Sequence, residues 1–204
     1  MSEEGGPVTL AVTGPLACGK STFVAMLGEL GAETISADGV VHDLMATDAE
    51  LIEKIVRRFG EHVRGERGID RRVLGREVFS DRRALEDLEE MVHPLVWREV
   101  GRRISASRAP LFVAEVPLLF EGKHASDFDF TLTVLAPRER RLGWARERGM
   151  PERQFEAVEA RQLSAEEKAR RADIVVNNDG GMERLREQAV KVWERLLSGG
   201  GRGR

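Results

Sequence analysis

The segment GPLACGKS, residues 14–21, constrains the fold of this chain more than any other stretch of its sequence. It satisfies the pattern G-x4-G-K-S, follows the apolar run VTLAV and precedes the helix-like stretch TFVAMLGELG. Glycine allows a tight backbone curl that turns several N–H groups toward one phosphate, and the amino end of a helix adds a positive dipole. The pattern therefore predicts a strand, a phosphate-binding loop (the P-loop) and a helix in succession. The alternative is a glycine-rich turn with a chance lysine.

Apolar runs and helical patterns alternate along the rest of the chain. This alternation predicts an α/β fold with a five-stranded parallel sheet that is covered by helices on both faces. We expect strands at 8–12 and 33–36, in LFVAEVPLLF before a loop at Pro117, in DFTLTVLAP and in ADIVVNNDG. Helices are expected at 20–30, 38–45, 81–104 with a break near Pro94, 138–171 as two or three helices with Pro151 and Ser164 as start signals, and 182–197. Thr47 and Glu50 have the spacing of a capping box ahead of a further helix.

The balance of charge limits the partners of this protein. The 204 residues include 32 basic and 35 acidic side chains, a net charge of -3, which argues against nucleic-acid and membrane-surface binding. One cysteine cannot form an internal disulfide, and no apolar run approaches the roughly 20 residues that cross a bilayer. With an acidic N-terminal segment, these features predict a cytoplasmic protein, expected to be a monomer. Residues 198–204, SGGGRGR, are expected to form a disordered tail.

The P-loop residues are the candidate contacts to ATP. Lys20 can reach the β- and γ-phosphates, and the Ser21 hydroxyl is a candidate ligand for Mg²⁺. Cys18 is a small filler by position, although a helix amino end can lower a thiol pKa and make it sensitive to oxidation. The candidate ATP-binding residues of the loop are Gly14, Pro15, Leu16, Ala17, Cys18, Gly19, Lys20, Ser21 and Thr22.

The remaining motifs indicate a kinase that acts on a small molecule. A signalling GTPase would carry an Asn-Lys-x-Asp motif after a later strand, which NNDG at 177–180 does not satisfy. The chain is also short for a motor or helicase core. Asp38 follows the second expected strand, and ligands gather at the carboxyl ends of strands in such sheets. Asp38 is therefore either a catalytic base or the N-cap of the next helix.

Several segments, in this order, resemble the dephospho-coenzyme A kinase family: VTGPLACGKST, ISADGVVHDL, GIDRRVLGREVFSD, LEEMVHPLVW, EVPLLFE and ADIVVNNDG. The likeness runs from about Val8 to Val192. It implies ATP-dependent phosphorylation of the ribose 3′-hydroxyl of dephospho-coenzyme A, the last step of coenzyme A synthesis. It also implies a fold like that of nucleoside monophosphate kinases. Residues 1–197 would form one kinase unit, with a core at 8–37, 109–136 and 172–197, a helical acceptor-binding insertion at about 38–108, and a lid at about 137–171.

The resemblance also assigns roles to individual residues. Asp38 matches the catalytic carboxylate, and Lys20 and Ser21 match the phosphate lysine and the metal-side hydroxyl. Glu115 is a further candidate near the metal or the substrate, and Lys168 matches a family position near the lid. Asn177 and Gly180 are candidates to hold adenine through backbone groups, although Asn177 is equally a turn former. The candidate substrate-binding residues, besides Asp38, are Arg71, His93, Pro94, Pro117, Leu118, Leu119, Glu121 and Gln162. Read without the resemblance, His93 would be a capping or packed histidine.

Three departures from the family pattern bear on the site. Ser36 stands where the family often carries an aspartate, and Pro15 and Ala17 stand where its loop usually carries glycines. Pro15 has no N–H to donate, and Ala17 is expected to avoid positive φ. The lid arginines are irregularly spaced, so Arg141, Arg146 and Arg148 are all catalytic candidates, while most arginines here would be solvated helix residues. Two alternatives remain: another small-molecule kinase, acting on a nucleotide or nucleoside, and an ATP-binding protein that has lost catalysis.

Overall fold

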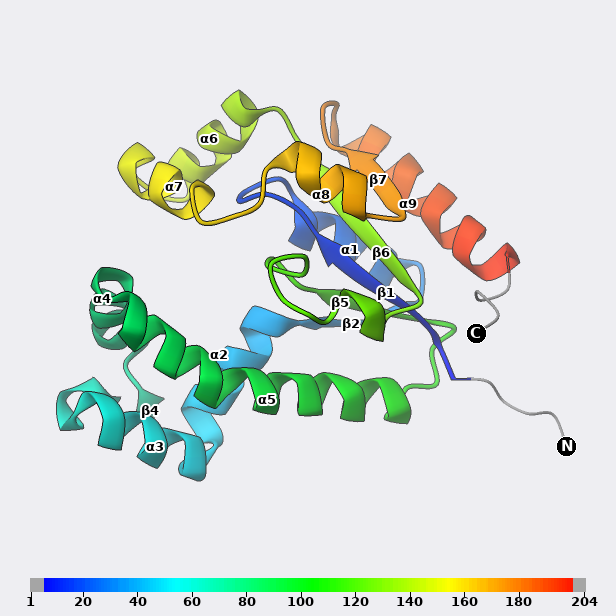
Figure 1. The fold of residues 1–204 in the computed structure, drawn as a ribbon. Helices are drawn as coiled ribbons and strands as arrows, with labels where there is room; N and C mark the ends of the chain where they lie inside the picture. Colours follow the sequence, from blue (N-terminus) through cyan, green and yellow to red (C-terminus); the bar gives the residue numbers. More distant parts are fainter. Residues whose placement is uncertain (1–5, 200–204) are drawn as a thin grey trace, which may run out of the picture. The chain divides into compact units, whose positions relative to one another are not determined.

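The apolar run that precedes the P-loop forms the central strand of a parallel sheet. The structure is a computed structural model that describes residues 6–199, except for the side chain of Ser80. Its main sheet has the order β2-β5-β1-β6-β7, and the pairs β1/β5, β1/β6 and β6/β7 are parallel (Figure 1). The register places Leu10 of β1 opposite Val113 of β5 and Phe130 of β6. The expected five-stranded parallel sheet is confirmed; its strands are β1 (Val8–Thr13), β2 (Glu33–Ser36), β5 (Leu111–Glu115), β6 (Phe130–Leu135) and β7 (Ile174–Asn177).

Two helices cover one face of this sheet. The helix after the P-loop, α1 (Lys20–Glu29), packs against the last helix, α9 (Met182–Ser198). Phe23 and Leu27 of α1 and Leu185 of α9 are buried with the apolar side chains of the strands in one core cluster. Central strands of parallel sheets are buried on both faces, which is why β1 is buried without alternation from Thr9 to Thr13.

The chain divides into two compact units. Residues 36–103 form one unit, and residues before and after this segment form the other, which contains the main sheet. The smaller unit contains α2 (Ala37–Thr47), α3 (Ala49–Phe59), the 3-10 turn Glu61–Val63, the strands β3 (Arg64–Gly65) and β4 (Gly68–Ile69), and α4 (Arg71–Ser80). The long helix α5 (Arg82–Ala106) begins in this unit and ends in the other.

The hairpin of β3 and β4 in the smaller unit was not predicted from the sequence. Its strands are two residues long and antiparallel, with Gly65 paired to Gly68. Gly68 has φ +81°, and a Cβ there would lie 2.2 Å from the carbonyl oxygen of Met45. Strands this short leave no apolar periodicity in the sequence, so only the glycine indicates the turn.

Two details of the helices correct the sequence predictions. The expected break near Pro94 is wrong, because α5 continues through this residue. Proline removes one helical hydrogen bond, but Val92, Val96 and Val100 form a buried stripe that holds the turns on both sides. The N-cap of α3 is Asp48, which accepts a hydrogen bond from the Leu51 N–H at 2.9 Å, and not Thr47. Aspartate has the stronger preference for this position.

The charged region after β6 forms three helices, as expected: α6 (Arg138–Glu147), α7 (Glu152–Glu159) and α8 (Ala165–Arg171). Pro151 precedes α7 directly, and Ser164 caps α8 by accepting a hydrogen bond from the Glu167 N–H. The last helix extends to Ser198, a residue expected in the tail; residues 200–204 of that tail lie outside the described residues.

None of the helices within residues 6–199 combines the length and the apolar character that crossing a membrane requires.

Candidate active site

The P-loop joins β1 to α1 through a backbone that requires glycine at both ends. Gly14 has φ +149° and Gly19 has φ +95°. A Cβ on Gly14 would lie 2.3 Å from the Val134 carbonyl oxygen, and one on Gly19 would lie 2.4 Å from Asn178 Nδ2. No described side chain caps the amino end of α1, and its first turn contains no acidic residue. The N–H groups and the dipole of this helix end are therefore suited to bind an anion.

Ala17 corrects one expectation about the loop. It has φ +58°, and it is the one non-glycine residue with positive φ among residues 6–199. This value lies in the small left-handed region that L-residues can enter at a cost of roughly 1–2 kcal/mol. The loop therefore reaches its curled form with alanine at this position.

The Lys20 side chain is folded back onto the loop. It is 8% exposed, and its Nζ donates to the carbonyl oxygens of Gly14 at 3.1 Å and Pro15 at 3.0 Å. These contacts hold one positive charge at the mouth of the turn, where phosphate oxygens would be bound.

Cys18 is a filler of the loop and not a reactive thiol. The side chain is buried, and its Sγ lies 2.8 Å from where a Cβ of Gly14 would be. Burial raises the pKa of the Cys18 thiol, and the nearby charge of Lys20 only partly opposes this effect. The expectation that the helix end lowers the pKa of Cys18 is therefore wrong, because the loss of hydration on burial raises this pKa by more than the nearby positive groups lower it.

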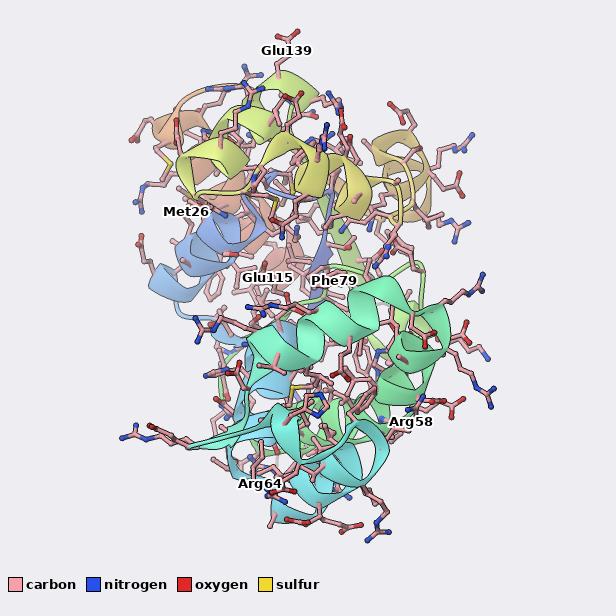
Figure 2. The ribbon with its side chains drawn as sticks, turned by 90° about the vertical axis from the view of Figure 1, so that its left-hand side faces the viewer. Met26, Arg58, Arg64, Phe79, Glu115 and Glu139 are labelled. Carbon is pink, nitrogen blue, oxygen red and sulfur yellow. The ribbon has the colours of Figure 1, made fainter. Side chains whose placement is uncertain are left out.

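Ser21 and Glu115 place two oxygen donors side by side. Ser21 Oγ, in the first turn of α1, donates to Glu115 Oε1 at 2.9 Å. Glu115, which is labelled in Figure 2, is the last residue of β5. Hydroxyl and carboxylate oxygens are ligands that Mg²⁺ accepts, and Mg²⁺ in kinases takes its other ligands from water and phosphate. No cluster of three or more histidine, cysteine, aspartate or glutamate side chains within residues 6–199 could hold a metal by itself. The pair therefore fits a metal that arrives with a nucleotide.

Only one of the three candidate lid arginines contacts the P-loop among the described residues. Arg141 is 6% exposed, and it donates to the Leu16 carbonyl at 3.4 Å, the Ala136 carbonyl at 3.2 Å and Glu159 at 2.7 Å. Arg146 is exposed and forms an ion pair with Glu152, while Arg148 is exposed at the end of α6. Arg141 is thus the candidate that is already placed beside the loop.

A buried lysine fixes the segment after β5. Lys168 of α8 is 0% exposed, and its Nζ lies 2.8 Å from Glu121 Oε1 and 2.9 Å from the Pro117 carbonyl oxygen. Thr13, the last residue of β1, donates to the same Pro117 carbonyl at 3.0 Å. Burial lowers the pKa of Lys168, and the bond to Glu121 opposes that effect.

Among the substrate-binding candidates of this segment, Glu121 is a structural anchor, Leu119 is buried in the core and Leu118 is 46% exposed.

Gln162 lies against the P-loop and not only near the lid. Its Oε1 accepts a hydrogen bond from the Leu16 N–H at 2.9 Å. Gln162 and Arg141 therefore hold the two peptide groups on either side of Leu16.

The end of β7 differs in detail from expectation. Both backbone groups of Asn177 are bonded to the Gln188 side chain, and the Gly180 carbonyl accepts from Arg140. The next residue, Asn178, was missed. Its side chain is buried, and Nδ2 donates to the Cys18 carbonyl of the P-loop at 3.0 Å. The adjacent Asn177 and Asn178 mark this strand end in the sequence, but the sequence does not show which of the two side chains contacts the P-loop.

The other candidates belong to the smaller unit. Ser36 is the N-cap of α2, where it accepts from the Gly39 N–H, so Asp38 is not the cap and lies exposed in the first turn. Arg71 Nη1 donates to His42 Nδ1 at 2.9 Å, which requires the His42 tautomer protonated on Nε2. His93 and Pro94 are exposed in the middle of α5, so His93 neither caps a helix nor packs in a core.

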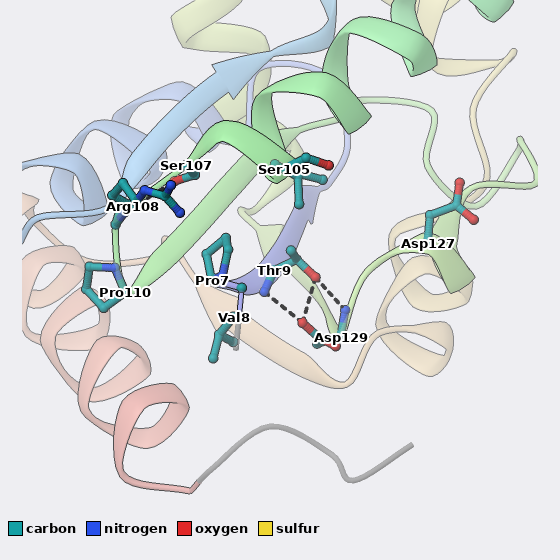
Figure 3. Close-up of a pocket in the computed structure, with 12 residues that line it drawn as sticks. Pro7, Val8, Thr9, Ser105, Ser107, Arg108, Pro110, Asp127 and Asp129 are labelled. Carbon is teal, nitrogen blue, oxygen red and sulfur yellow. Dashed lines mark hydrogen bonds between the residues drawn. The ribbon is translucent and has the colours of Figure 1, made fainter. Parts of the chain in front are cut away.

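A pocket of about 940 Å³ lies at the amino end of β1, whereas the P-loop follows its carboxyl end (Figure 3). Asp129 Oδ2 accepts from both the N–H and the hydroxyl of Thr9, at 2.9 and 2.8 Å. Thr9 and Asp129 are thus hydrogen-bonded to each other, at the end of β1 that is remote from the P-loop. We therefore do not assign this pocket to the reaction.

Comparison with known proteins gives a consistent result. A family model described as dephospho-CoA kinase matches residues 8–184. The dephospho-CoA kinase of Protochlamydia amoebophila is 37% identical over 193 residues, which cover 92% of this chain and 95% of that protein. The dephospho-CoA kinase of Symbiobacterium thermophilum is 39% identical over 197 residues, which cover 94% of this chain and 82% of that protein.

Solved structures agree with these sequence matches. A Thermus thermophilus protein of known crystal structure superimposes with a TM-score of 0.83 at 35% identity, covering 95% of this chain and 99% of that one. The dephospho-CoA kinase from Campylobacter jejuni gives a TM-score of 0.69 at 31% identity, with coverages of 94% and 98%. A shikimate kinase from Acinetobacter baumannii, with a TM-score of 0.55 at 18% identity and 95% coverage of both chains, shares the fold. The P-loop, the parallel sheet and these matches together show that this chain belongs to the dephospho-CoA kinase family.

Proposed function

We propose that this protein transfers the γ-phosphoryl group of ATP to the ribose 3′-hydroxyl of dephospho-coenzyme A, which yields coenzyme A and ADP. The observation that carries this proposal is the family match over residues 8–184, which includes a P-loop with its lysine folded onto the loop. Another small-molecule kinase and a decayed ATP-binding protein are both less favoured, because two relatives that align over 92% and 94% of this chain are dephospho-CoA kinases.

On the donor side, the P-loop amides and the amino end of α1 bind the phosphates of ATP. Lys20 Nζ keeps the Gly14 and Pro15 carbonyls with two of its N–H groups, donates the third to a phosphate oxygen and stabilises the charge that spreads over the phosphates during transfer. Gln162 acts on this ATP side, because its contact is with Leu16 of the loop. Asn177 and Gly180 remain our candidates next to adenine.

Ser21 and Glu115 would hold Mg²⁺, together with oxygens of the nucleotide. Bound there, Mg²⁺ supplies positive charge against the β- and γ-phosphates. The support is the chemistry of the two donors and their 2.9 Å separation.

On the acceptor side, Asp38 takes the proton of the 3′-hydroxyl as that oxygen attacks. The support is its exposed carboxylate in the first turn of α2, which follows β2 directly, and the cap role of Ser36, which leaves Asp38 available. Arg71, His93 and Pro94 bind the coenzyme A portion, and Pro117 and Leu118 line the acceptor loop. Leu119 and Glu121 hold that loop from within.

Arg141 stabilises the charge of the transition state, in preference to Arg146 and Arg148. Its support is the contact with the Leu16 carbonyl and its burial. Guanidinium groups placed on transferring phosphates have this effect in other kinases. All of these residues come from one chain, and we propose that a monomer is active.

The test is direct detection of the product. Purified protein is mixed with ATP, Mg²⁺ and dephospho-coenzyme A, and coenzyme A is measured by mass spectrometry. The matched control is the Lys20→Ala protein purified in the same way, which excludes a contaminating kinase. We expect coenzyme A with the wild type only, and none after chelation of Mg²⁺. Equal or faster transfer to a nucleoside or nucleotide acceptor would overturn the proposal.

A further inference from the structure

The carbonyl groups of the P-loop raise a physical problem that the loop cannot solve by itself. A phosphate site needs N–H groups that converge on the anion, so the carbonyls of the same peptides must point away from it. A buried carbonyl without a donor costs free energy, and it favours rotation of its peptide.

Each carbonyl from Gly14 to Leu16 has a donor from a group already assigned to the site. Lys20 Nζ donates to the carbonyls of Gly14 and Pro15, and Arg141 Nη1 donates to that of Leu16. The Cys18 carbonyl precedes Gly19, whose N–H lies at the amino end of α1. The Cys18 carbonyl accepts a hydrogen bond from Asn178 Nδ2 at 3.0 Å.

Asn178 is held firmly where it can make this contact. Its side chain is buried, and its own N–H donates to the Leu135 carbonyl at the end of β6 at 2.7 Å. Gly19 allows the close approach, since a Cβ there would lie 2.4 Å from Asn178 Nδ2. The amide is thus fixed by two strand ends and faces the loop at the peptide that joins Cys18 to Gly19.

We infer that Asn178 is a positioning residue for the phosphates of ATP: its side-chain N–H holds the Cys18 carbonyl outward, so that the following N–H points into the phosphate site. Asn178 acts through the loop and does not touch the reacting atoms. The inference rests on the proposed use of the P-loop as the ATP site, and it assigns to the end of β7 a role toward phosphate, in addition to any role toward adenine.

Binding of ADP and of adenosine by calorimetry separates this role from a merely structural one. Asn178→Asp keeps the shape of the side chain but replaces the donor with an oxygen that repels the Cys18 carbonyl. We expect the Kd for ADP to rise on the order of tenfold, as for a lost hydrogen bond next to an unsatisfied carbonyl. The Kd for adenosine should stay within about twofold, because adenosine has no phosphate that could accept a hydrogen bond from the Gly19 N–H.

The matched control is the reverse change at the next position, Asp179→Asn. Asp179 is exposed and lies 3.3 Å from Arg184, so both nucleoside and nucleotide binding should stay at wild-type values. If Asn178→Asp does not fold, Asn178→Leu removes the donor without adding charge, and the same ADP-selective loss is expected.

Equal losses for ADP and adenosine, or no loss for either, would overturn the role of Asn178. That result is distinct from failure of the proposed function, which would appear as absence of coenzyme A formation by the wild type.

Discussion

At the scale of single residues, the cap of α2 is Ser36, which leaves the Asp38 carboxylate available for the catalytic role that we propose. Ser36 caps α2 through the Gly39 N–H at 3.3 Å, and Asp38 lies exposed in the same turn. Ser36, two positions before Asp38, therefore serves the helix and not the chemistry that we propose. Asp38 is the acidic residue in the first turn of α2, and we propose that it is the catalytic carboxylate.

Asp38→Asn should lower turnover about a hundredfold or more, as for loss of a general base, while the KM for ATP stays within about twofold. The measurement is steady-state kinetics with ATP and dephospho-coenzyme A. Asp43→Asn is the control, since it makes the same change on the exposed surface of the same helix. Near-normal turnover of the Asp38 variant would remove this residue from the mechanism.

The contacts of individual side chains divide into those that spacing predicts and those that it cannot. The P-loop pattern predicted the positions of Gly14, Gly19 and Lys20, because the loop is local and its geometry follows from adjacent residues. The bond from Asn178 to Cys18 joins positions 160 residues apart, so no local pattern contains it. Arg141 likewise became distinct from the other lid arginines only when its burial beside the loop was known.

At the scale of elements, periodicity predicted the main strands and helices, because their apolar faces are long enough to repeat. It failed for the β3–β4 hairpin, whose strands are too short to show a repeat. It also failed at Pro94, where local rules predict a break but packing of the buried stripe keeps α5 continuous. Tertiary packing outweighed the local preference there.

Pro94→Ala should raise the free energy of unfolding by roughly 1–3 kcal/mol, because it restores an N–H donor within a continuous helix. Urea denaturation followed by circular dichroism measures this change. The control is a second substitution on the exposed surface of α5, Arg98→Ala, which should leave stability within about 0.5 kcal/mol. Unchanged or lower stability of the Pro94 variant would mean that the proline ring makes compensating contacts.

The anchoring of α8 by Lys168 gives a second prediction at this scale. Lys168→Met should cost about 3 kcal/mol of unfolding free energy, because it leaves the Glu121 side chain, which is 18% exposed, without its cation. Adding Glu121→Gln should recover part of the loss. Lys191→Met on the exposed side of α9 is the control, with a change below about 0.5 kcal/mol. Thermal or urea unfolding is measured for the wild type, Lys168→Met, Lys168→Met with Glu121→Gln, and Lys191→Met. Equal losses of stability in Lys168→Met and Lys191→Met would contradict the anchoring role.

At the scale of the whole molecule, the two compact units correspond to the proposed division between donor and acceptor. The sheet unit contains the P-loop, Glu115 and Arg141, and residues 36–103 contain Asp38, Arg71 and His93. The acceptor-binding insertion predicted from the sequence, at about 38–108, stays a prediction. Its end is difficult to predict because the boundary between the units falls inside the unbroken helix α5.

Hydrogen exchange should report the two units separately. A bound ligand at a hundred times its Kd adds about 2.7 kcal/mol to the stability of the state that binds it. We therefore expect ADP to slow exchange in the P-loop and α1, and dephospho-coenzyme A to slow exchange in peptides from 36–103. Mass spectrometry of peptides from the labelled protein measures both effects. Protection confined to the sheet unit with dephospho-coenzyme A would contradict an acceptor role for the smaller unit.

The interleaving of the two units also sets the order in which the chain can be assembled on the ribosome. Strand β1 occupies residues 8–13, but its neighbours β5 and β6 begin only at 111 and 130. At a synthesis rate of about 5–20 residues per second, β1 waits roughly 5–20 seconds for a partner. The segment 36–103 is translated in full during that interval. The side chains of β1 therefore lack their neighbours in the sheet until the second half of the message is being read.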